Sequence, residues 1–244
     1  MNRQIKFAVI AFAFFSLIAC NQEKKSNPEV EKQPKGLVED VLTKEQQDAL
    51  SSDKVIKILK EGNVRFTKND LTARNHSEQV RNSALSQYPK AIVLSCIDSR
   101  VPVEDVFDRG IGDLFVARIA GNIVNVDILG SMEYACKVSG SKLILVLGHE
   151  HCGAIKAAID NVELGNITAM LQKIKPAIDN VIYEGERNSK NQEFVHMVCD
   201  SNVNNSIEQI RINSPILKEM EDKGEIKIVG AYYNMNTGKA EWLE

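Results

Sequence analysis

The stretch "KLILVLGHEHCGA" at residues 142–154 decides the fold, because it joins an apolar strand pattern to a turn and then to a helix pattern. Its first half is nearly continuous in apolar, β-forming residues, which is typical of a strand covered on both faces. Similar runs are "AIVLS" at 91–95, "DLFVARIA" at 113–120 and "EIKIVGAYYNM" at 225–235. Each of these runs predicts a buried strand.

Helix-like segments lie between these strands. Apolar residues near helical spacing predict helices over 126–138, 154–161, 167–174 and 192–212, and a helical region over 43–66 that Gly62 is expected to interrupt. Residues 69–90 predict an irregular or partly helical segment, and "NTGKAEWL" at 236–243 predicts a turn into a short last strand. The alternation predicts an α/β fold, with a mostly parallel central sheet flanked by helices.

Length and composition fit one large domain behind a leader. The chain has 244 residues, a net charge of −3 and 43% hydrophobic residues. The acidic charge is weak and unclustered, so we expect no nucleic acid as a partner. The five cysteines are too few and too scattered for a small disulfide scaffold.

Residues 1–19 have the pattern of a lipoprotein signal peptide. A short basic region precedes an apolar run that is shorter than the ~20 residues of a membrane span. The run ends in "LIAC", which resembles the bacterial lipobox, so we expect Cys20 to carry lipid and to anchor the chain to the membrane. Asn21 after this cysteine favours the periplasmic side of the outer membrane in the bacterial cell envelope. An ordinary secretory leader cut nearby is the alternative.

The polar segment over residues 20–41 is predicted to be a flexible tether, and residues 42–244 are predicted to form the folded domain. A surface extension lying on the domain is the alternative to a tether.

Two strand ends carry potential metal ligands. Cys96 directly follows the first strand and His149 follows the third, and ligands of parallel sheets collect at the carboxyl ends of strands. Cys152 follows His149 with two residues between them, in the turn that leads to a helix. Thiolates and imidazole suit Zn²⁺, and three protein ligands leave a fourth position for water, as a catalytic site requires. The sequence therefore predicts a zinc site.

Other readings of these residues compete with a zinc site. A disulfide between Cys96 and Cys152 is the alternative, because the leader implies an oxidising compartment. His151 competes with His149 as the ligand, but it adjoins Cys152 in sequence and is expected in the cleft wall or at the surface. The other two cysteines of the domain, Cys136 and Cys199, lack ligand partners at useful spacing and are expected to be buried small hydrophobic residues.

Asp98 and Arg100 follow Cys96 in "CIDSR" and are close enough to pair. The guanidinium would keep the carboxylate ionised and fixed in place. A carboxylate beside zinc can ligate the metal or accept a hydrogen bond from its water. A purely structural ion pair is the alternative.

"CIDSRV" at 96–101, followed by "GHEHCGA" at 148–154, resembles the β-class carbonic anhydrases, whose motifs are C-x-D-S-R and H-x-x-C. The similarity covers nearly all of residues 42–243 and includes "LKEGNVRF", "QYPKAIVLSC", "GDLFVARIAGN" and "GSMEYA". The resemblance implies that residues 42–244 form a catalytic domain with one Zn²⁺ per subunit. It implies reversible hydration of carbon dioxide to bicarbonate and a proton, by attack of hydroxide held on the zinc.

The resemblance assigns Cys96, His149 and Cys152 as zinc ligands and Asp98 with Arg100 as the catalytic dyad. In the closed form of the family, Asp98 leaves the arginine and takes the fourth metal position.

The resemblance also assigns the surroundings of the metal. Gln87 matches a glutamine that hydrogen-bonds substrate, and Tyr134 and Gly153 match residues of the cleft. Ile119 stands where many relatives carry Asn, which is a departure from the family pattern. The family forms homodimers with the cleft between subunits, and homotetramers of these. Hydrolysis of CS₂ or COS on the same scaffold, and non-catalytic binding of zinc or bicarbonate, are the alternatives.

Overall fold

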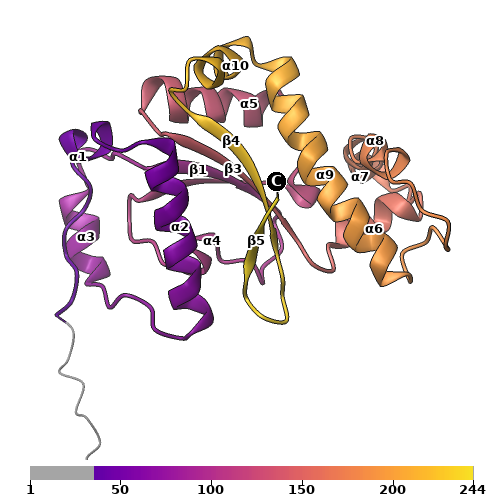
Figure 1. Cartoon of the computed structure of the whole chain (residues 1–244), viewed down its shortest axis with the longest axis horizontal. Helices are drawn as coiled ribbons and strands as arrows, with labels where there is room; N and C mark the ends of the chain where they lie inside the picture. Colours follow the sequence, from indigo (N-terminus) through magenta and orange to yellow (C-terminus); the bar gives the residue numbers. More distant parts are fainter. Residues whose placement is uncertain (1–35, 244) are drawn as a thin grey trace, which may run out of the picture. The chain divides into compact units, whose positions relative to one another are not determined.

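The computed structural model describes residues 36–243 and contains one five-stranded sheet with the strand order β2-β1-β3-β4-β5 (Figure 1). The strands are β1 (Ala91–Ser95), β2 (Leu114–Arg118), β3 (Leu143–His149), β4 (Lys227–Tyr233) and β5 (Ala240–Trp242). The first four run parallel, and only β5 is antiparallel to its neighbour. The predicted α/β class and mostly parallel sheet are confirmed.

Central strands β1 and β3 are buried along their whole length. Because successive side chains of a strand point to opposite faces, Ile92 and Leu94 enter one core and Ala91 and Val93 enter the other. This burial on both faces explains why the sequences of these strands are continuous apolar runs.

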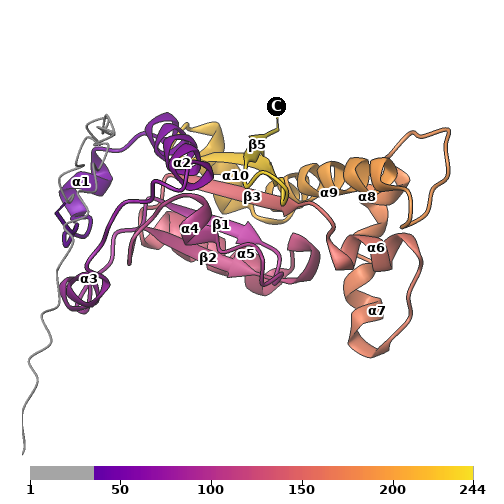
Figure 2. The same ribbon diagram turned by 90° about the horizontal axis from the view of Figure 1, so that it is seen from below.

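Helices cover both faces of the sheet. Helix α2 and the short α4 pack on one face, and α5, α9 and α10 pack on the other (Figure 1). Figure 2 shows α6, α7 and α8 together at the end toward which β3 points. The helices are α1 (Lys44–Asp48), α2 (Ser52–Thr67), α3 (His76–Asn82), α4 (Val103–Val106), α5 (Val126–Glu133), α6 (Gly153–Ile159), α7 (Gly165–Leu171), α8 (Lys175–Asp179), α9 (Gln192–Asn213) and α10 (Pro215–Asp222), with a 3₁₀ turn η1 (Ala120–Asn122) and a π turn η2 (Tyr134–Val138).

The structure corrects several predicted boundaries. The helical region over 43–66 is two helices, because Ser51 caps the start of α2 by accepting a hydrogen bond from the Lys54 amide. Gly62 does not interrupt α2; a Cβ there would lie 1.9 Å from the Phe107 carbonyl oxygen, so glycine permits this close packing. The predicted helix over 126–138 ends as a π turn from Tyr134. His149 is the last residue of β3 and not the residue after it.

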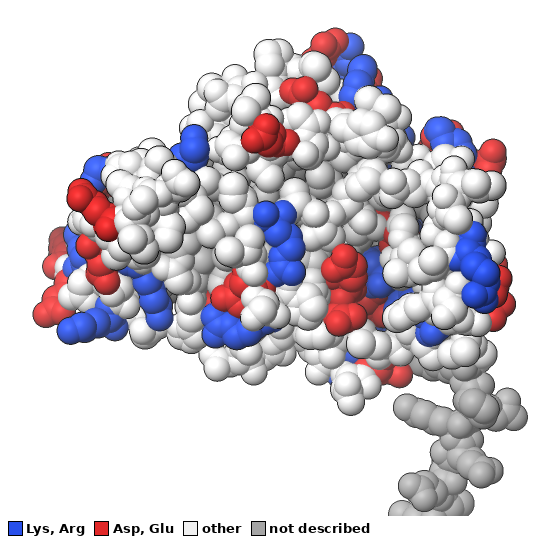
Figure 3. Space-filling model, turned by 180° about the vertical axis from the view of Figure 1, so that it is seen from behind, with Lys and Arg blue, Asp and Glu red and all other residues white. Residues whose placement is uncertain are grey.

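Short helices such as α4, α8 and α10 lie outside the predicted segments, and the residues of the predicted signal peptide and Cys20 lie outside the described part of the chain. Among residues 36–243, no helix has both the length and the apolarity needed to cross a bilayer. On the face shown in Figure 3, lysines and arginines are interspersed with aspartates and glutamates.

Candidate metal centre

Three potential ligand atoms converge at the carboxyl end of the sheet. Cys96 directly follows β1, and His149 ends the neighbouring strand β3. The register that pairs Ser95 with Leu147 brings these two residues to the same edge. Cys152 is the N-cap of α6, in the turn that follows β3. The two Sγ atoms and a ring nitrogen of His149 all lie within 4.8 Å of one another, and all three residues are buried.

Hydrogen bonding fixes the tautomer of His149. Its Nδ1 lies 2.9 Å from the carbonyl oxygen of Glu150, and a carbonyl can only accept, so Nδ1 carries the proton. Nε2 of the neutral ring is then an unprotonated acceptor. This atom is buried and has no hydrogen-bond partner, although buried polar atoms are normally satisfied. The ring therefore presents a free lone pair to the two sulfurs.

The two cysteines are free thiols with their Sγ atoms 4.0 Å apart, so the disulfide alternative is wrong for this structure. A hydrogen bond from the Cys152 thiol is the largest cause that lowers the pKa of Cys96. The Gly121 amide, which donates to the Cys96 sulfur at 3.4 Å, also lowers it. Pairing with Cys96 and burial raise the pKa of Cys152.

The residues present fit a zinc ion. Tetrahedral Zn–S bonds of about 2.3 Å would place two sulfurs about 3.8 Å apart, close to the 4.0 Å observed. The donor set of two thiols and one imidazole is soft, and the orphaned Nε2 supplies the nitrogen. Only this group of three cysteine, histidine or acidic residues meets the geometric requirement within residues 36–243.

Asp98 and Arg100 form the predicted ion pair beside this cluster. The Asp98 carboxylate accepts hydrogen bonds from Arg100 Nε at 2.9 Å, Nη2 at 2.8 Å and the Arg100 amide at 3.0 Å. The side-chain bonds of Arg100 lower the pKa of Asp98 to about 2. Asp98 Oδ2 lies 4.0 Å from His149 Nε2, so the ionised carboxylate stands next to the ligands while it remains paired with the arginine.

Residues behind the candidate ligands hold the segment from Cys96 to Asp98 in place. The sequence analysis did not predict these residues. Gly121 of η1 donates its amide to the Cys96 sulfur, and its carbonyl accepts from Asn202 Nδ2 of α9 at 2.8 Å. Arg118 at the end of β2 donates to the carbonyl oxygens of Cys96 and Asp98. One signal was available: Asn202 is a polar residue on the buried stripe of α9.

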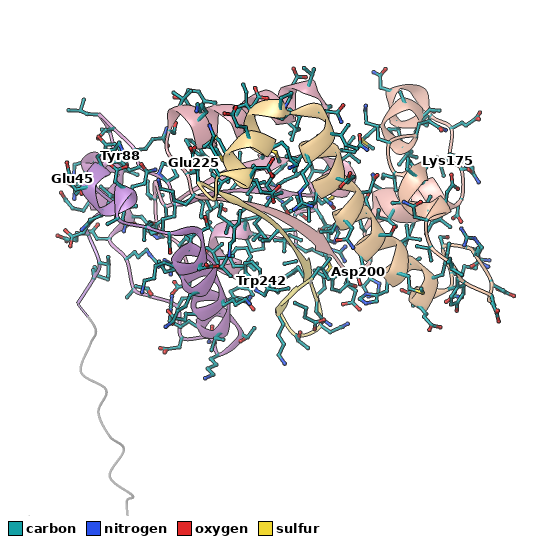
Figure 4. All side chains as sticks on the ribbon, turned by 45° about the horizontal axis from the view of Figure 1, so that its top comes forward. Glu45, Tyr88, Lys175, Asp200, Glu225 and Trp242 are labelled. Carbon is teal, nitrogen blue, oxygen red and sulfur yellow. The ribbon has the colours of Figure 1, made fainter. Side chains whose placement is uncertain are left out.

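The structure does not bring Gln87 to the cluster within one chain. Gln87 precedes β1, whereas Cys96 follows it, and a strand of five residues spans roughly 16 Å. Tyr88, the next residue, lies beside α1 in Figure 4, far from Asp200 and Lys175 at the other end of the molecule. The nearby Pro89 carbonyl accepts from Gln47 of α1 at 2.8 Å, which ties this segment to the amino edge of the sheet.

Tyr134 also lies away from the cluster. Its ring packs edge-on against Phe115, with centroids 6.3 Å apart, and Phe115 pairs with Ile92 near the amino end of β1. Gly153 adjoins Cys152 as the first residue of α6, so it does lie next to the cluster of candidate metal ligands.

The remaining expectations for the cysteines and histidines are confirmed. Cys136 and Cys199 are buried, and burial raises the pKa of each thiol to about 12. His151 is partly exposed and turns away from the cluster, with Nδ1 3.1 Å from Gln192 Oε1. Ile119, the departure from the family pattern, packs its side chain against the apolar cores.

Comparison with known proteins relates the chain to one family. A family model described as "Carbonic anhydrase" matches residues 91–240, which is more than half of the chain. A carbonic anhydrase of Mycolicibacterium smegmatis is 34% identical over 191 residues, covering 76% of this chain and 90% of that protein. Carbonic anhydrase 2 of Mycobacterium tuberculosis is 33% identical over 190 residues, covering 75% and 89%.

Solved structures share the fold. The Coccomyxa β-carbonic anhydrase in complex with acetazolamide superposes with a TM-score of 0.61 at 24% identity, covering 78% of this chain and 84% of that one. A structure from a study of two tetrameric β-carbonic anhydrases of Sordaria macrospora gives a TM-score of 0.58 at 24% identity, covering 67% and 84%.

Proposed function

Because the chain belongs to the β-class carbonic anhydrase family, we propose that it hydrates carbon dioxide reversibly to bicarbonate and a proton at one zinc ion held by Cys96, His149 and Cys152. The observation that carries this proposal is the buried cluster in which an unprotonated, unpartnered His149 Nε2 faces two free sulfurs. A buried polar atom without a hydrogen-bond partner is unfavourable in an ordinary apolar core.

Zinc, when bound, would lower the pKa of a coordinated water toward neutrality and so supply a nucleophile at neutral pH. The chain's own residues would then order the reaction. The Glu150 carbonyl keeps the His149 ring in the ligating tautomer. Asp98 accepts the hydrogen of the attacking oxygen and so directs a lone pair of that oxygen at the carbon of CO₂. Arg100 keeps the carboxylate ionised and in place through its two side-chain hydrogen bonds.

Closure of the site remains part of this proposal. Release of Asp98 from Arg100 would allow the carboxylate to serve as a fourth ligand, since Oδ2 already lies 4.0 Å from His149 Nε2. In this proposal, an intact pair between Asp98 and Arg100, as seen here, would leave the fourth position to substrate and water.

We further propose that a second copy of the chain completes the cleft. Strand β2 is the outer strand of the sheet, and its apolar residues are only partly buried. A groove of about 550 Å³ between β2 and α5 is lined by Phe115, Ala117, Val126 and Tyr134. An apolar edge of this kind is normally covered. Antiparallel pairing of two β2 strands would set the amino edge of one sheet beside the carboxyl edge of the other.

That arrangement accounts for the two residues that one chain leaves far from its metal. Gln87 and Tyr134 lie toward the amino edge of their own sheet. In a two-fold dimer they would face the metal centre of the partner, where the glutamine amide can bind a substrate oxygen. We propose a homodimer as the minimal active unit, with a homotetramer as the larger assembly.

Location is a proposal that rests on the amino-acid sequence alone. The apolar run that ends in "LIAC" supports lipid modification of Cys20 and anchoring to the cell envelope, on the periplasmic side of the outer membrane. Labelling of cells with a radioactive fatty acid, followed by Cys20→Ala as the unlabelled control, tests this anchor.

A matched pair of cysteine variants tests the zinc proposal. Cys96→Ala removes a ligand, whereas Cys136→Ala removes a similarly buried thiol that belongs to a different apolar cluster. We expect the first variant to lose bound zinc and CO₂ hydration together and the second to keep both. Stoichiometric zinc in folded Cys96→Ala protein would refute the ligand assignment. Turnover of CS₂ or COS in parallel assays would identify the first alternative function. A wild-type protein that binds zinc but turns over none of these substrates would identify the second, non-catalytic binding.

Mixed subunits test the shared cleft. Cys96→Ala chains lack the metal but keep Gln87, and Gln87→Ala chains keep the metal. If Gln87 acts across the interface, co-expressed chains form sites with a metal from one subunit and a glutamine from the other, and activity returns. If Gln87 acts within its own chain, the mixture stays as inactive as its parents.

A further inference from the structure

Arg118 makes an unusual pair of contacts for a surface arginine. It is the last residue of β2, in register with Ser95 at the end of β1. Its Nε donates to the Cys96 carbonyl oxygen at 2.8 Å, and its Nη2 donates to the Asp98 carbonyl oxygen at 2.5 Å. One planar cation thus spans the two carbonyls on either side of Ile97.

These contacts fix the part of the chain that leaves the sheet beside the metal ligands. Cys96 is buried, but Ile97 is 62% exposed, so packing does not hold the segment between Cys96 and Asp98. The Asp98 carbonyl also accepts from the Val101 amide at 3.2 Å, which closes the turn. The backbone of Asp98 is therefore held by Arg118 and Val101, and none of these bonds involves its carboxylate.

The carboxylate of Asp98 depends on this backbone. Arg100 restrains the carboxylate through three hydrogen bonds, but Arg100 belongs to the same exposed loop and has a side chain that is 55% exposed. The ion pair can therefore move as one body with the loop. Arg118 links that loop to the sheet, because it belongs to β2.

We propose that Arg118 is a positioning residue, which sets the place of the Asp98–Arg100 pair over the metal centre by holding the carbonyls of Cys96 and Asp98. This inference rests on the proposed function for its effect on turnover. Hydrogen bonds from a charged donor to carbonyls are stronger than neutral ones, and the rigid guanidinium fork reaches two acceptors at once. Lysine carries the same charge but lacks that fork.

The structure offers a matched control in Arg187. This arginine also holds two backbone carbonyls, those of Ile178 and Val181, in a segment that contains none of the residues proposed to hold the metal. Replacing Arg187 removes the same positive charge and the same kind of hydrogen bonds to two carbonyl oxygens. A general loss of stability would therefore affect both variants.

The test compares Arg118→Gln, Arg118→Lys and Arg187→Gln in the zinc-loaded full chain. We expect full zinc content in all three, because Arg118 touches no ligand atom. Misplacement of a catalytic group by about 1 Å can cost on the order of 100-fold in rate. We therefore expect kcat to fall roughly 10- to 100-fold in Arg118→Gln with little change in KM, less in Arg118→Lys, and not at all in Arg187→Gln.

A second readout does not need turnover. In protein labelled with ¹⁵N-arginine, the Nε–H of Arg100 should exchange slowly with solvent while it is held by Asp98. We expect faster exchange in Arg118→Gln and wild-type exchange in Arg187→Gln. Unchanged exchange together with unchanged kcat would overturn the proposal. So would a raised KM for bicarbonate at normal kcat, because it would make Arg118 an anion-binding residue. If the wild type has no activity at all, the exchange measurement still decides the positioning role.

Discussion

Replacing Gly121 by alanine should destabilise the fold and weaken zinc binding at the same time. Gly121 lies in η1 with φ of +71°, a conformation that favours glycine. A Cβ at this position would lie 2.8 Å from Ile174 Cδ1 and 3.3 Å from Ala154 Cβ. The amide of the same residue donates to the Cys96 sulfur, so any shift of η1 is transmitted to a ligand.

Backbone strain and overpacking both contribute to the expected loss of stability. A non-glycine residue in the left-handed region costs roughly 1–2 kcal/mol. Overpacking costs roughly 1–3 kcal/mol, and the lower part of this range applies because Ile174 Cδ1 is the free end of a flexible side chain. The free energy of unfolding should therefore fall by about 2–3 kcal/mol, or Tm by about 4–12 °C for a domain of this size. Loss of a bond to a ligand typically costs about 10- to 100-fold in metal affinity.

Urea unfolding of the zinc-free protein and competition with a chromophoric chelator measure the two effects separately. Gly165→Ala is the control for backbone strain alone, because Gly165 has φ of +46° but open space around its Cα. That variant should lose about 1 kcal/mol and bind zinc normally. If Gly121→Ala matches the control in both measurements, neither the predicted contact nor the amide–sulfur bond matters.

Three further variants probe separate parts of the structure. Asp98→Asn should keep zinc yet lose about 10²- to 10⁴-fold in kcat by stopped-flow hydration, because the amide cannot replace an ionised acceptor. Asp108→Asn should lower the unfolding free energy by about 3–5 kcal/mol in urea at pH 7, since it leaves Arg65 and Arg74 without their buried partner. Although burial opposes ionisation of Asp108, its hydrogen bonds with these arginines lower its pKa to about 2, so this stabilisation is present above pH ~4 and fades as the pH falls toward 2. Phe115→Arg should place a charge in the β2 groove, reduce the sedimentation coefficient of the assembly and abolish activity without removing zinc.

Strand positions were predictable because burial on both faces of the sheet leaves a continuous apolar signature. The predicted run at 91–95 matches β1 in full, and the other four strands fall within their predicted segments or end one residue beyond them. From the strand ends it followed that Cys96 and His149 meet at one edge, which the register of β1 and β3 confirms. Helices of four or five residues, such as α4, are too short to show a period.

The residues that hold the candidate ligands in place could not be predicted from the sequence. Arg118 and Gly121 act through the carbonyls and the sulfur of residues 20 or more positions away in the sequence. Backbone carbonyls carry no residue-specific signal, so only the folded geometry shows which arginine reaches them. Asn202 is the exception, since an amide on a mostly apolar helix stripe indicates that it has a buried hydrogen-bond partner.

Zinc binding and catalysis should separate when the assembly is diluted. Every group that would hold the metal, together with Asp98, Arg100 and Arg118, comes from one chain and from contacts within it. Gln87 and Tyr134 lie toward the amino edge of that chain's sheet, away from its own metal ligands, and in the proposed dimer a partner paired along β2 would supply them. A single chain should therefore bind zinc at any protein concentration, whereas specific activity should fall once the concentration drops below that needed for pairing. Constant specific activity in a species shown by sedimentation to be monomeric would place the whole reaction in one chain.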